Sequence, residues 1–206
     1  MYIQNVQASV ESVNGAVYRA SPRRRQAQAG FSLVEVSIVM AIVLLLSIIA
    51  IPTIRTYVIE SKVPKVGEEL ARFILHTKIN ASGGSAAPYD GISTGNLAGM
   101  LRDSGIFSVS GSEASPTVHH GLGVDGEVSV AQADAGASFS ITLSKVHHAA
   151  CPSIASVLQR LSDSIVLTPE GGSAAVIKDA DTNYSALEAE SRCAQGDRNM
   201  FVFTVS

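Results

Sequence analysis

A pair of small residues meets a long apolar run in Ala29-Gly30-Phe31-Ser32-Leu33-Val34-Glu35-Val36-Ser37. The run continues without a charge from Val36 to Ile51, which is close to the length that a helix needs to span a bilayer. Glu35 is the only ionisable side chain between Phe31 and Ile54, and an acid in a hydrocarbon stretch costs about 3 kcal/mol on insertion scales. The sequence therefore predicts an apolar helix with a functional carboxylate near its start.

No Lys or Arg inside the run can neutralise this carboxylate, but a cut after Gly30 would create an α-ammonium on Phe31. Three arginines, Arg23 to Arg25, precede the junction. Together these features resemble the class III signal of type IV prepilins and of the related type II secretion pseudopilins. The resemblance covers the basic leader, Gly30 before the cut, Phe31 as first mature residue, Glu35 as fifth, and Pro52 where the family's N-terminal helix kinks.

The resemblance implies how the junction works. In that family a membrane aspartyl peptidase cleaves after the glycine and methylates the new amine, here that of Phe31. Glu35 would then neutralise the Phe31 ammonium of a neighbouring subunit. A buried ion pair that loses one partner costs about 3 to 5 kcal/mol, so this pairing would set the register between subunits.

Two other kinds of N-terminal segment are an uncleaved signal anchor and a cleavable secretory signal. A secretory peptidase needs small residues at an A-x-A-like site after the apolar run. Ile48-Ile49-Ala50 has isoleucine where a small residue is required, and no cysteine offers a lipoprotein site. Both alternatives therefore fit the sequence less well.

Length and charge place the rest of the chain outside the cytoplasm. Removing 30 of the 206 residues leaves enough for one long helix and one globular head. The mature part carries 11 basic and 17 acidic side chains, a net charge of −6, whereas the leader is basic. This asymmetry predicts a cytoplasmic leader and an external head. An acidic chain without tryptophan does not suggest nucleic-acid binding.

The two cysteines, Cys151 and Cys193, both lie in the exported half. An oxidising compartment favours a disulfide between them, and the alternatives are two free thiols or a zinc site. Zinc is disfavoured because no C-x-x-C or H-x-x-x-H spacing accompanies them, although His147 and His148 are close to Cys151.

A single long helix is expected from Ser32 to about Ala81, softly interrupted at Pro52 and Pro64, where missing backbone hydrogen bonds favour kinks. Its first half is apolar all round. Its second half has one apolar face, made by Ile59, Val63, Val66, Leu70, Phe73 and Thr77. The glycines and serines of 82–85 end it.

The remainder predicts a connecting loop and a sheet. Residues 82–123 are rich in Gly, Ser and Ala and are expected to be a loop with one short helix near 95–103, capped by Ser93 or Thr94. Alternating or β-prone segments predict strands at 124–131, 138–146, 165–168, 174–178 and 200–205. A second short helix is expected to begin at Cys151-Pro152.

Three patterns are weak as ligand sites. Gly121 to Gly126 reads G-x-G-x-x-G, but a strand rather than a helix is expected to follow it, which favours a glycine-rich turn over a dinucleotide site. The pairs His119-His120 and His147-His148 are expected on the surface, because adjacent side chains point apart on a strand. No motif of a hydrolase, zinc protease or P-loop occurs.

Asp179, Asp181, Asn183 and Glu190 supply oxygen ligands at four positions of a calcium loop. Tyr184 stands where such a loop needs glycine for its sharp turn. Secretion pseudopilins use calcium in a C-terminal loop, but a polar loop before Cys193 explains the same composition. No metal or cofactor is therefore expected.

We expect an α+β protein with the type IV pilin fold, in which a long N-terminal helical spine, half of it transmembrane, packs against an antiparallel sheet. Its expected parts are a leader (1–30), a transmembrane or filament-core helix (31–54), an amphipathic half-helix (55–81), an αβ-loop (82–123) and a β-sheet head (124–206) with a disulfide-bounded region (151–193). The leader length and the disulfide-bounded segment resemble type IVb pilins, whereas Phe31 is more typical of type IVa.

The resemblance implies a structural, non-enzymatic subunit that polymerises with copies of itself. Its implied partners are the prepilin peptidase, an inner-membrane assembly platform with its ATPase, and an outer-membrane secretin. The subunit would reside in the inner membrane and then in an extracellular pilus used for adhesion, motility, DNA uptake or conjugation. The alternatives are a type II secretion pseudopilin and a signal-anchored periplasmic receptor that keeps residues 1–30.

Overall fold

A computed structural model of the chain describes residues 30–81 and 83–206, so residues 1–29 of the expected leader lie outside the described part. The chain divides into two compact units, residues 1–43 and 44–206. One helix, α1 (Leu33–Asn80), runs through both. Gly83 and Gly84 lie in a turn beyond its end, and Gly84 has a φ of 82°, a left-handed conformation that glycine adopts at low cost.

The helix α1 continues through both prolines without a break. The expectation of one long helix across Pro52 and Pro64 is confirmed. A bend at each proline stays a prediction, because neither nitrogen carries the proton that would bond the carbonyl one turn earlier.

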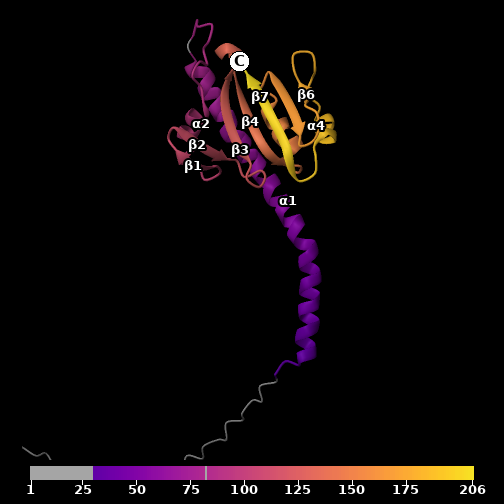
Figure 1. Cartoon of the computed structure of the whole chain (residues 1–206). Coiled ribbons are helices and arrows are strands. Elements are labelled where there is room, and N and C mark those ends of the chain that lie inside the picture. The colour runs from indigo at the N-terminus through magenta and orange to yellow at the C-terminus, as the bar shows by residue number, and fades with distance from the viewer. Residues whose placement is uncertain (1–29, 82) are drawn as a thin grey trace, which may run out of the picture. The chain divides into compact units, whose positions relative to one another are not determined.

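Seven strands form one antiparallel sheet in the order β1-β2-β3-β4-β7-β5-β6 (Figure 1). The strands are β1 (Ser108–Ser112), β2 (Ser115–His119), β3 (Glu127–Ala133), β4 (Ser138–His147), β5 (Ser164–Pro169), β6 (Ala175–Lys178) and β7 (Asp197–Val205). The closing strand β7 lies between β4 and β5, so the last residues of the chain complete the middle of the sheet.

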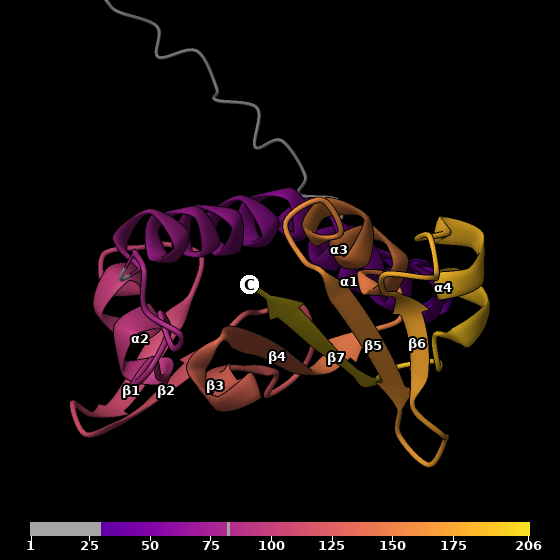
Figure 2. The same ribbon diagram turned by 90° about the horizontal axis from the view of Figure 1, so that it is seen from above.

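Shorter helices cover the ends of this sheet. They are α2 (Thr94–Leu101), α3 (Cys151–Leu158) and α4 (Ala186–Arg192), and a 3-10 turn, η1 (Asp134–Gly136), joins β3 to β4. Figure 2 shows α1 and α3 on one face of the sheet, with α2 beside β1 and β2 and α4 beside β6. The prediction of an α+β head, with a helix packed on an antiparallel sheet, is confirmed.

The core lies between α1 and the inner face of the sheet. The buried side chains of α1 within unit 44–206 are Ile59, Val63, Val66, Leu70, Phe73 and Ile74. Phe73 meets Phe139 of β4 edge to face, with ring centroids 6.3 Å apart. Fully burying an aliphatic or aromatic side chain stabilises by about 1.5 to 3 kcal/mol, so this face holds the helix on the sheet. The predicted apolar face is confirmed except at Thr77, which is half-buried.

The helices α1 and α3 approach closely at a glycine. A Cβ added to Gly67 of α1 would lie 2.4 Å from Cγ1 of Val157, which is on α3. No atom pair tolerates that distance, so the contact requires glycine at this position or a shift of α3. Gly67 thus sets how near the disulfide-bounded part of the head comes to the spine.

Two predicted segments differ from the structure. Residues 82–123 contain the predicted short helix, α2, which Ser93 caps, but they also contain the hairpin β1–β2, which extends the sheet and was not predicted. The serine- and glycine-rich composition of β1 hid this edge strand. The helix α4 was also missed, although Ser185 caps it by accepting a hydrogen bond from the Glu188 amide. The strand expected from Val124 begins at Glu127.

Candidate functional site

The junction after Gly30 lies in exposed, non-helical backbone. Gly30, Phe31 and Ser32 precede the first helical residue, Leu33, and the Phe31 side chain is 85% exposed. A Cβ added to Gly30 would meet no described atom within 4 Å. The peptide bond between Gly30 and Phe31 therefore lies outside the helix, between exposed residues.

Glu35 lies in the first turn of α1, where the free N–H groups of the helix create a partial positive charge. Its Oε2 accepts a hydrogen bond from the backbone N–H of Ser32 at 3.4 Å. Among the described residues, Glu35 makes no ion pair. Its charge is thus available to a cation that comes from elsewhere.

The apolar part of α1 has no protein partner. In the described part of the chain, α1 is the one helix that is long and apolar enough to cross a membrane, and its most apolar window has a mean hydropathy of 2.8 with no buried residue. Exposed large side chains follow one another from Leu33 to Ile54. Such a surface is stable only in lipid or against other apolar helices.

Arg55 is the first basic side chain beyond this segment, and its Nη2 lies 3.3 Å from Oδ2 of Asp197 at the start of β7. The Arg55 side chain is about half exposed, so the pair contributes little to stability. The pair does connect the start of β7 to α1 at the point where the helix becomes polar.

A disulfide joins Cys151, the first residue of α3, to Cys193, which follows α4. The predicted pairing is confirmed, and no free cysteine remains among the described residues. The bond closes a loop across a separation of 42 residues that contains β5 and β6. In the chain-entropy account, closing a loop of this size stabilises the folded head by roughly 4 kcal/mol.

The calcium hypothesis gains no support. The Asp179 carboxylate accepts hydrogen bonds within its own turn, from the amides of Thr182 at 2.7 Å and Asp181 at 3.0 Å. Hydrogen bonds from Thr182 hold the pKa of Asp179 below its usual range. Within the described ranges, no three His, Cys, Asp or Glu side chains gather as a metal site, so Asp179, Asp181 and Glu190 do not form one together.

His120 is fully buried, so the expectation of surface histidines is wrong for it. Its Nδ1 accepts a hydrogen bond from the Leu122 amide at 2.9 Å, and its Nε2 lies 2.8 Å from the Ser144 carbonyl, to which it donates. The ring is therefore neutral, and burial lowers its pKa to about 4. A Cβ added to Gly126 would lie 2.4 Å from the ring. The glycine-rich turn at 121–126 thus encloses a histidine and not a nucleotide.

The second pair also differs from expectation. The rings of His147 and His148 face each other with centroids 4.2 Å apart, because β4 ends at His147 and the chain turns. His147 is buried, and desolvation lowers its pKa. Both histidines bond backbone amides, those of Ala149 and Gly196 respectively, which gives them a structural role.

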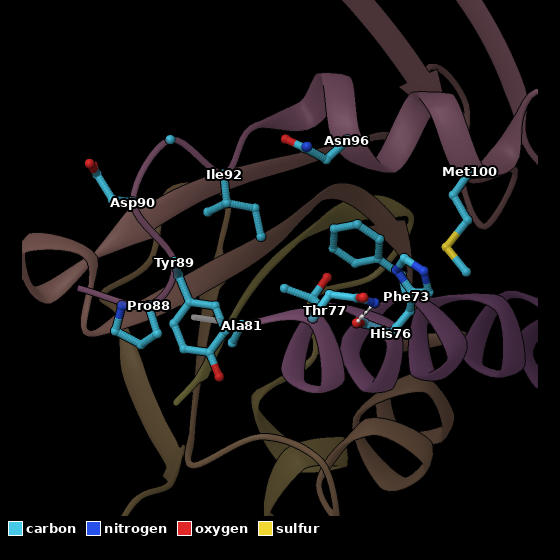
Figure 3. A pocket seen from close by; sticks show the side chains of 12 residues that line it. Phe73, His76, Thr77, Ala81, Pro88, Tyr89, Asp90, Ile92, Asn96 and Met100 are labelled. Carbon is cyan, nitrogen blue, oxygen red and sulfur yellow. Dashed lines mark hydrogen bonds between the residues drawn. The ribbon is translucent and has the colours of Figure 1, made fainter. Parts of the chain in front are cut away.

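A groove of about 550 Å³, which the sequence did not predict, lies between the last turns of α1, the loop before α2, and α2 itself (Figure 3). Phe73, Tyr89 and Met100 contribute apolar surface, whereas His76 and Asp90 are exposed beside it. In the described part of the chain, no cluster of metal-ligating residues lines it.

Two family models match the chain. The model described as PilS N terminal matches residues 84–206, which is more than half of the chain. The prokaryotic N-terminal methylation motif matches residues 25–51, which include Gly30, Phe31, Glu35 and the apolar run.

None of the curated proteins compared with the chain matches it. Among solved structures, one similar chain is that of the crystal structure of TcpA, a type IV pilin from Vibrio cholerae El Tor biotype. The two are 13% identical with a TM-score of 0.41, and the match covers 71% of this chain and 99% of that chain.

Proposed function

Because this chain belongs to the PilS family of type IV pilins, we propose that it is cut after Gly30 and that its mature form, beginning at an N-methylated Phe31, polymerises into a surface pilus. The observation that carries this proposal is the exposed apolar surface of α1 from Leu33 to Ile54, directly after the junction. A chain that is cut there keeps its apolar helix, so it stays in the membrane after processing.

The physics of assembly is a change of surroundings for this helix. In the inner membrane its side chains are solvated by lipid, and in a filament the same side chains pack against those of neighbouring helices. Burial stabilises by about 25 cal/mol per Å² of apolar surface taken from water, so a bundle of such helices needs no covalent links outside the membrane. The work of extraction comes from a cytoplasmic ATPase acting through a platform protein, and a secretin lets the filament cross the outer membrane.

The proposed register depends on Glu35 and Phe31. The carboxylate has no ionic partner among the described residues, and cleavage supplies an ammonium on every subunit. In a bundle of helices, a neighbour's ammonium satisfies the acid only at one axial offset. Other offsets leave a charge buried alone, at about 3 to 5 kcal/mol.

The disulfide Cys151–Cys193, which bounds the C-terminal segment, supports a pilin over a pseudopilin that depends on calcium. On the same segment we propose a type IVb-like pilin, although Phe31 is more typical of type IVa, with its head in the periplasm before assembly and on the filament surface afterwards.

Electron microscopy of sheared surface filaments, with mass spectrometry of their subunits, tests the proposal. We expect the subunit to start at methylated Phe31, and we expect Gly30→Glu to leave full-length precursor in the inner membrane, because the peptidase needs a small residue at the cut. Filaments built from chains that retain Met1, or surface filaments that lack this subunit altogether, would contradict it.

A further inference from the structure

The first turn of α1 is closed by two hydrogen bonds of Ser32, one to the Glu35 side chain and one to the Val34 backbone. Ser32 Oγ accepts a hydrogen bond from the Val34 amide at 3.3 Å, and the Ser32 amide donates to Glu35 Oε2 at 3.4 Å. The Ser32 carbonyl accepts the first helical bond, from the Val36 amide at 3.1 Å. Ser32 is therefore the N-cap and Glu35 the third helical residue of a capping box, with the serine bonding the second helical amide.

The residues on either side of the box fit the same pattern. Phe31 precedes the cap and Val36 is the fourth helical residue, the two positions of a hydrophobic staple. Both line one mostly apolar hollow, together with Glu35, Val39 and Met40. The segment 31–36 is thus a complete helix-start signal, and it places the cut one residue before the cap.

We propose that Ser32 is a positioning residue, which holds the Glu35 carboxylate at the N-terminal end of α1 in the unassembled subunit. The inference rests on the proposed function, in which Glu35 later pairs with a neighbour's ammonium. An acid in the membrane needs a partner, and the Ser32 amide supplies one within the same chain. The box keeps the Glu35 carboxylate beside the N-terminal end of α1. In a processed subunit this is also the end that would carry the Phe31 ammonium.

The box also makes the start of the helix independent of the proposed cleavage. The cut falls between Gly30 and Phe31, and every group of the box belongs to residues 32–35. The start of α1 at Leu33 is therefore the same before and after processing. Phe31 stays outside the helix, where its new amine is free to be methylated.

NMR of the full mature chain, held monomeric in detergent micelles, tests this positioning. Ser32→Ala should speed exchange of the Val34 amide roughly fivefold, since losing a cap typically costs about 1 kcal/mol. Alanine keeps the backbone amide that bonds Glu35 but loses the hydroxyl that fixes this amide at the cap, so the side-chain carboxyl 13C resonance of Glu35 should also move. Ser32→Thr, which keeps the hydroxyl, should restore both signals.

Ser37→Ala is the matched control, because the Ser37 hydroxyl bonds the Val34 carbonyl at 2.8 Å and takes no part in the box. It should leave the Glu35 resonance in place. The inference is overturned if Ser32→Ala leaves both signals unchanged, or if Ser37→Ala moves the Glu35 resonance equally. The readouts use monomers, so their failure is distinct from a failure to form filaments, which is scored on cells.

Discussion

At the scale of single residues, His120 shows how a polar side chain is built into a core. Burial of an unpaired imidazole would destabilise the folded state, but the Leu122 amide and the Ser144 carbonyl form hydrogen bonds with both ring nitrogens of His120. Gly126 makes the room, since any side chain there would overlap the ring. The residue is thus a neutral link between the 120–126 turn and strand β4.

This link makes stability depend on pH. Below pH 6.5 the unfolded chain binds a proton at His120, whereas the folded chain does so only near pH 4, where burial has placed the pKa. Unfolding therefore takes up a proton in this window, and the free energy of unfolding falls as the pH drops from 6.5 to 4, by at most roughly 3 kcal/mol. The lowered pKa of His147 acts in the same direction.

Urea unfolding of the mature chain in detergent between pH 7 and 4 measures this slope. His120→Gln should be less stable at pH 7 but should lose much of the dependence on pH. His76→Gln, a change at an exposed residue of α1, should retain it. If the free energy of unfolding of His120→Gln depended on pH as strongly as that of the unmodified chain, other titratable groups would be responsible.

At the scale of elements, the contact between α1 and α3 is set by Gly67. In a helix interior alanine is favoured over glycine by about 1 kcal/mol, but here the added methyl would meet Val157 at 2.4 Å. Overpacking a well-packed contact costs about 1 to 3 kcal/mol, so the clash outweighs the gain in helix propensity.

Gly67→Ala should therefore lower the unfolding midpoint of the head, by about 1 kcal/mol in free energy, when followed by circular dichroism. Val157→Ala removes the group with which the added methyl would clash. In that background Gly67→Ala should stabilise the head, so the double variant should be more stable than Val157→Ala alone. Gly99→Ala in α2 is the matched control, because a Cβ there meets nothing within 4 Å and should stabilise slightly. If Gly67→Ala behaves like Gly99→Ala, α3 is free to shift.

At the scale of the whole molecule, α1 supplies two surfaces with different partners. Residues 59–74 bury one face against the sheet, whereas the large apolar side chains that the structure describes between Leu33 and Ile54 stay exposed. The head is held together within the chain, through its core and its disulfide. The apolar part of α1 is completed only by lipid or by other subunits.

Glu35→Ala should permit cleavage after Gly30 but reduce filament number at least tenfold, because the peptidase acts at the junction while the charge serves assembly. Membrane levels of the processed subunit should stay normal, since removing an acid makes residence in lipid easier. Immunoblots of sheared and membrane fractions measure both.

Glu35→Gln separates charge from capping, because glutamine also completes a capping box. It should fail in assembly as Glu35→Ala does. Ordinary filaments from Glu35→Gln would assign the role of Glu35 to helix capping, and ordinary filaments from Glu35→Ala would show that apolar packing suffices for register.

The sequence by itself determined the spine, most of the sheet and the family. Those features depend on local patterns, such as the unbroken apolar run, the period of the buried face from Ile59 to Phe73, and the small-residue junction at Gly30. The pairing of Cys151 with Cys193 also followed, because only two cysteines exist.

Only the tertiary structure decided the rest. The hairpin β1–β2 forms although its composition resembles a loop, because its backbone bonds are completed by β3 at the edge of the sheet. His120 is buried because Ser144, 24 residues away, provides its acceptor. The need for glycine at Gly67 depends on Val157, which is on another helix. In each case the deciding neighbour is distant in sequence, so the local sequence pattern around the residue cannot predict the contact.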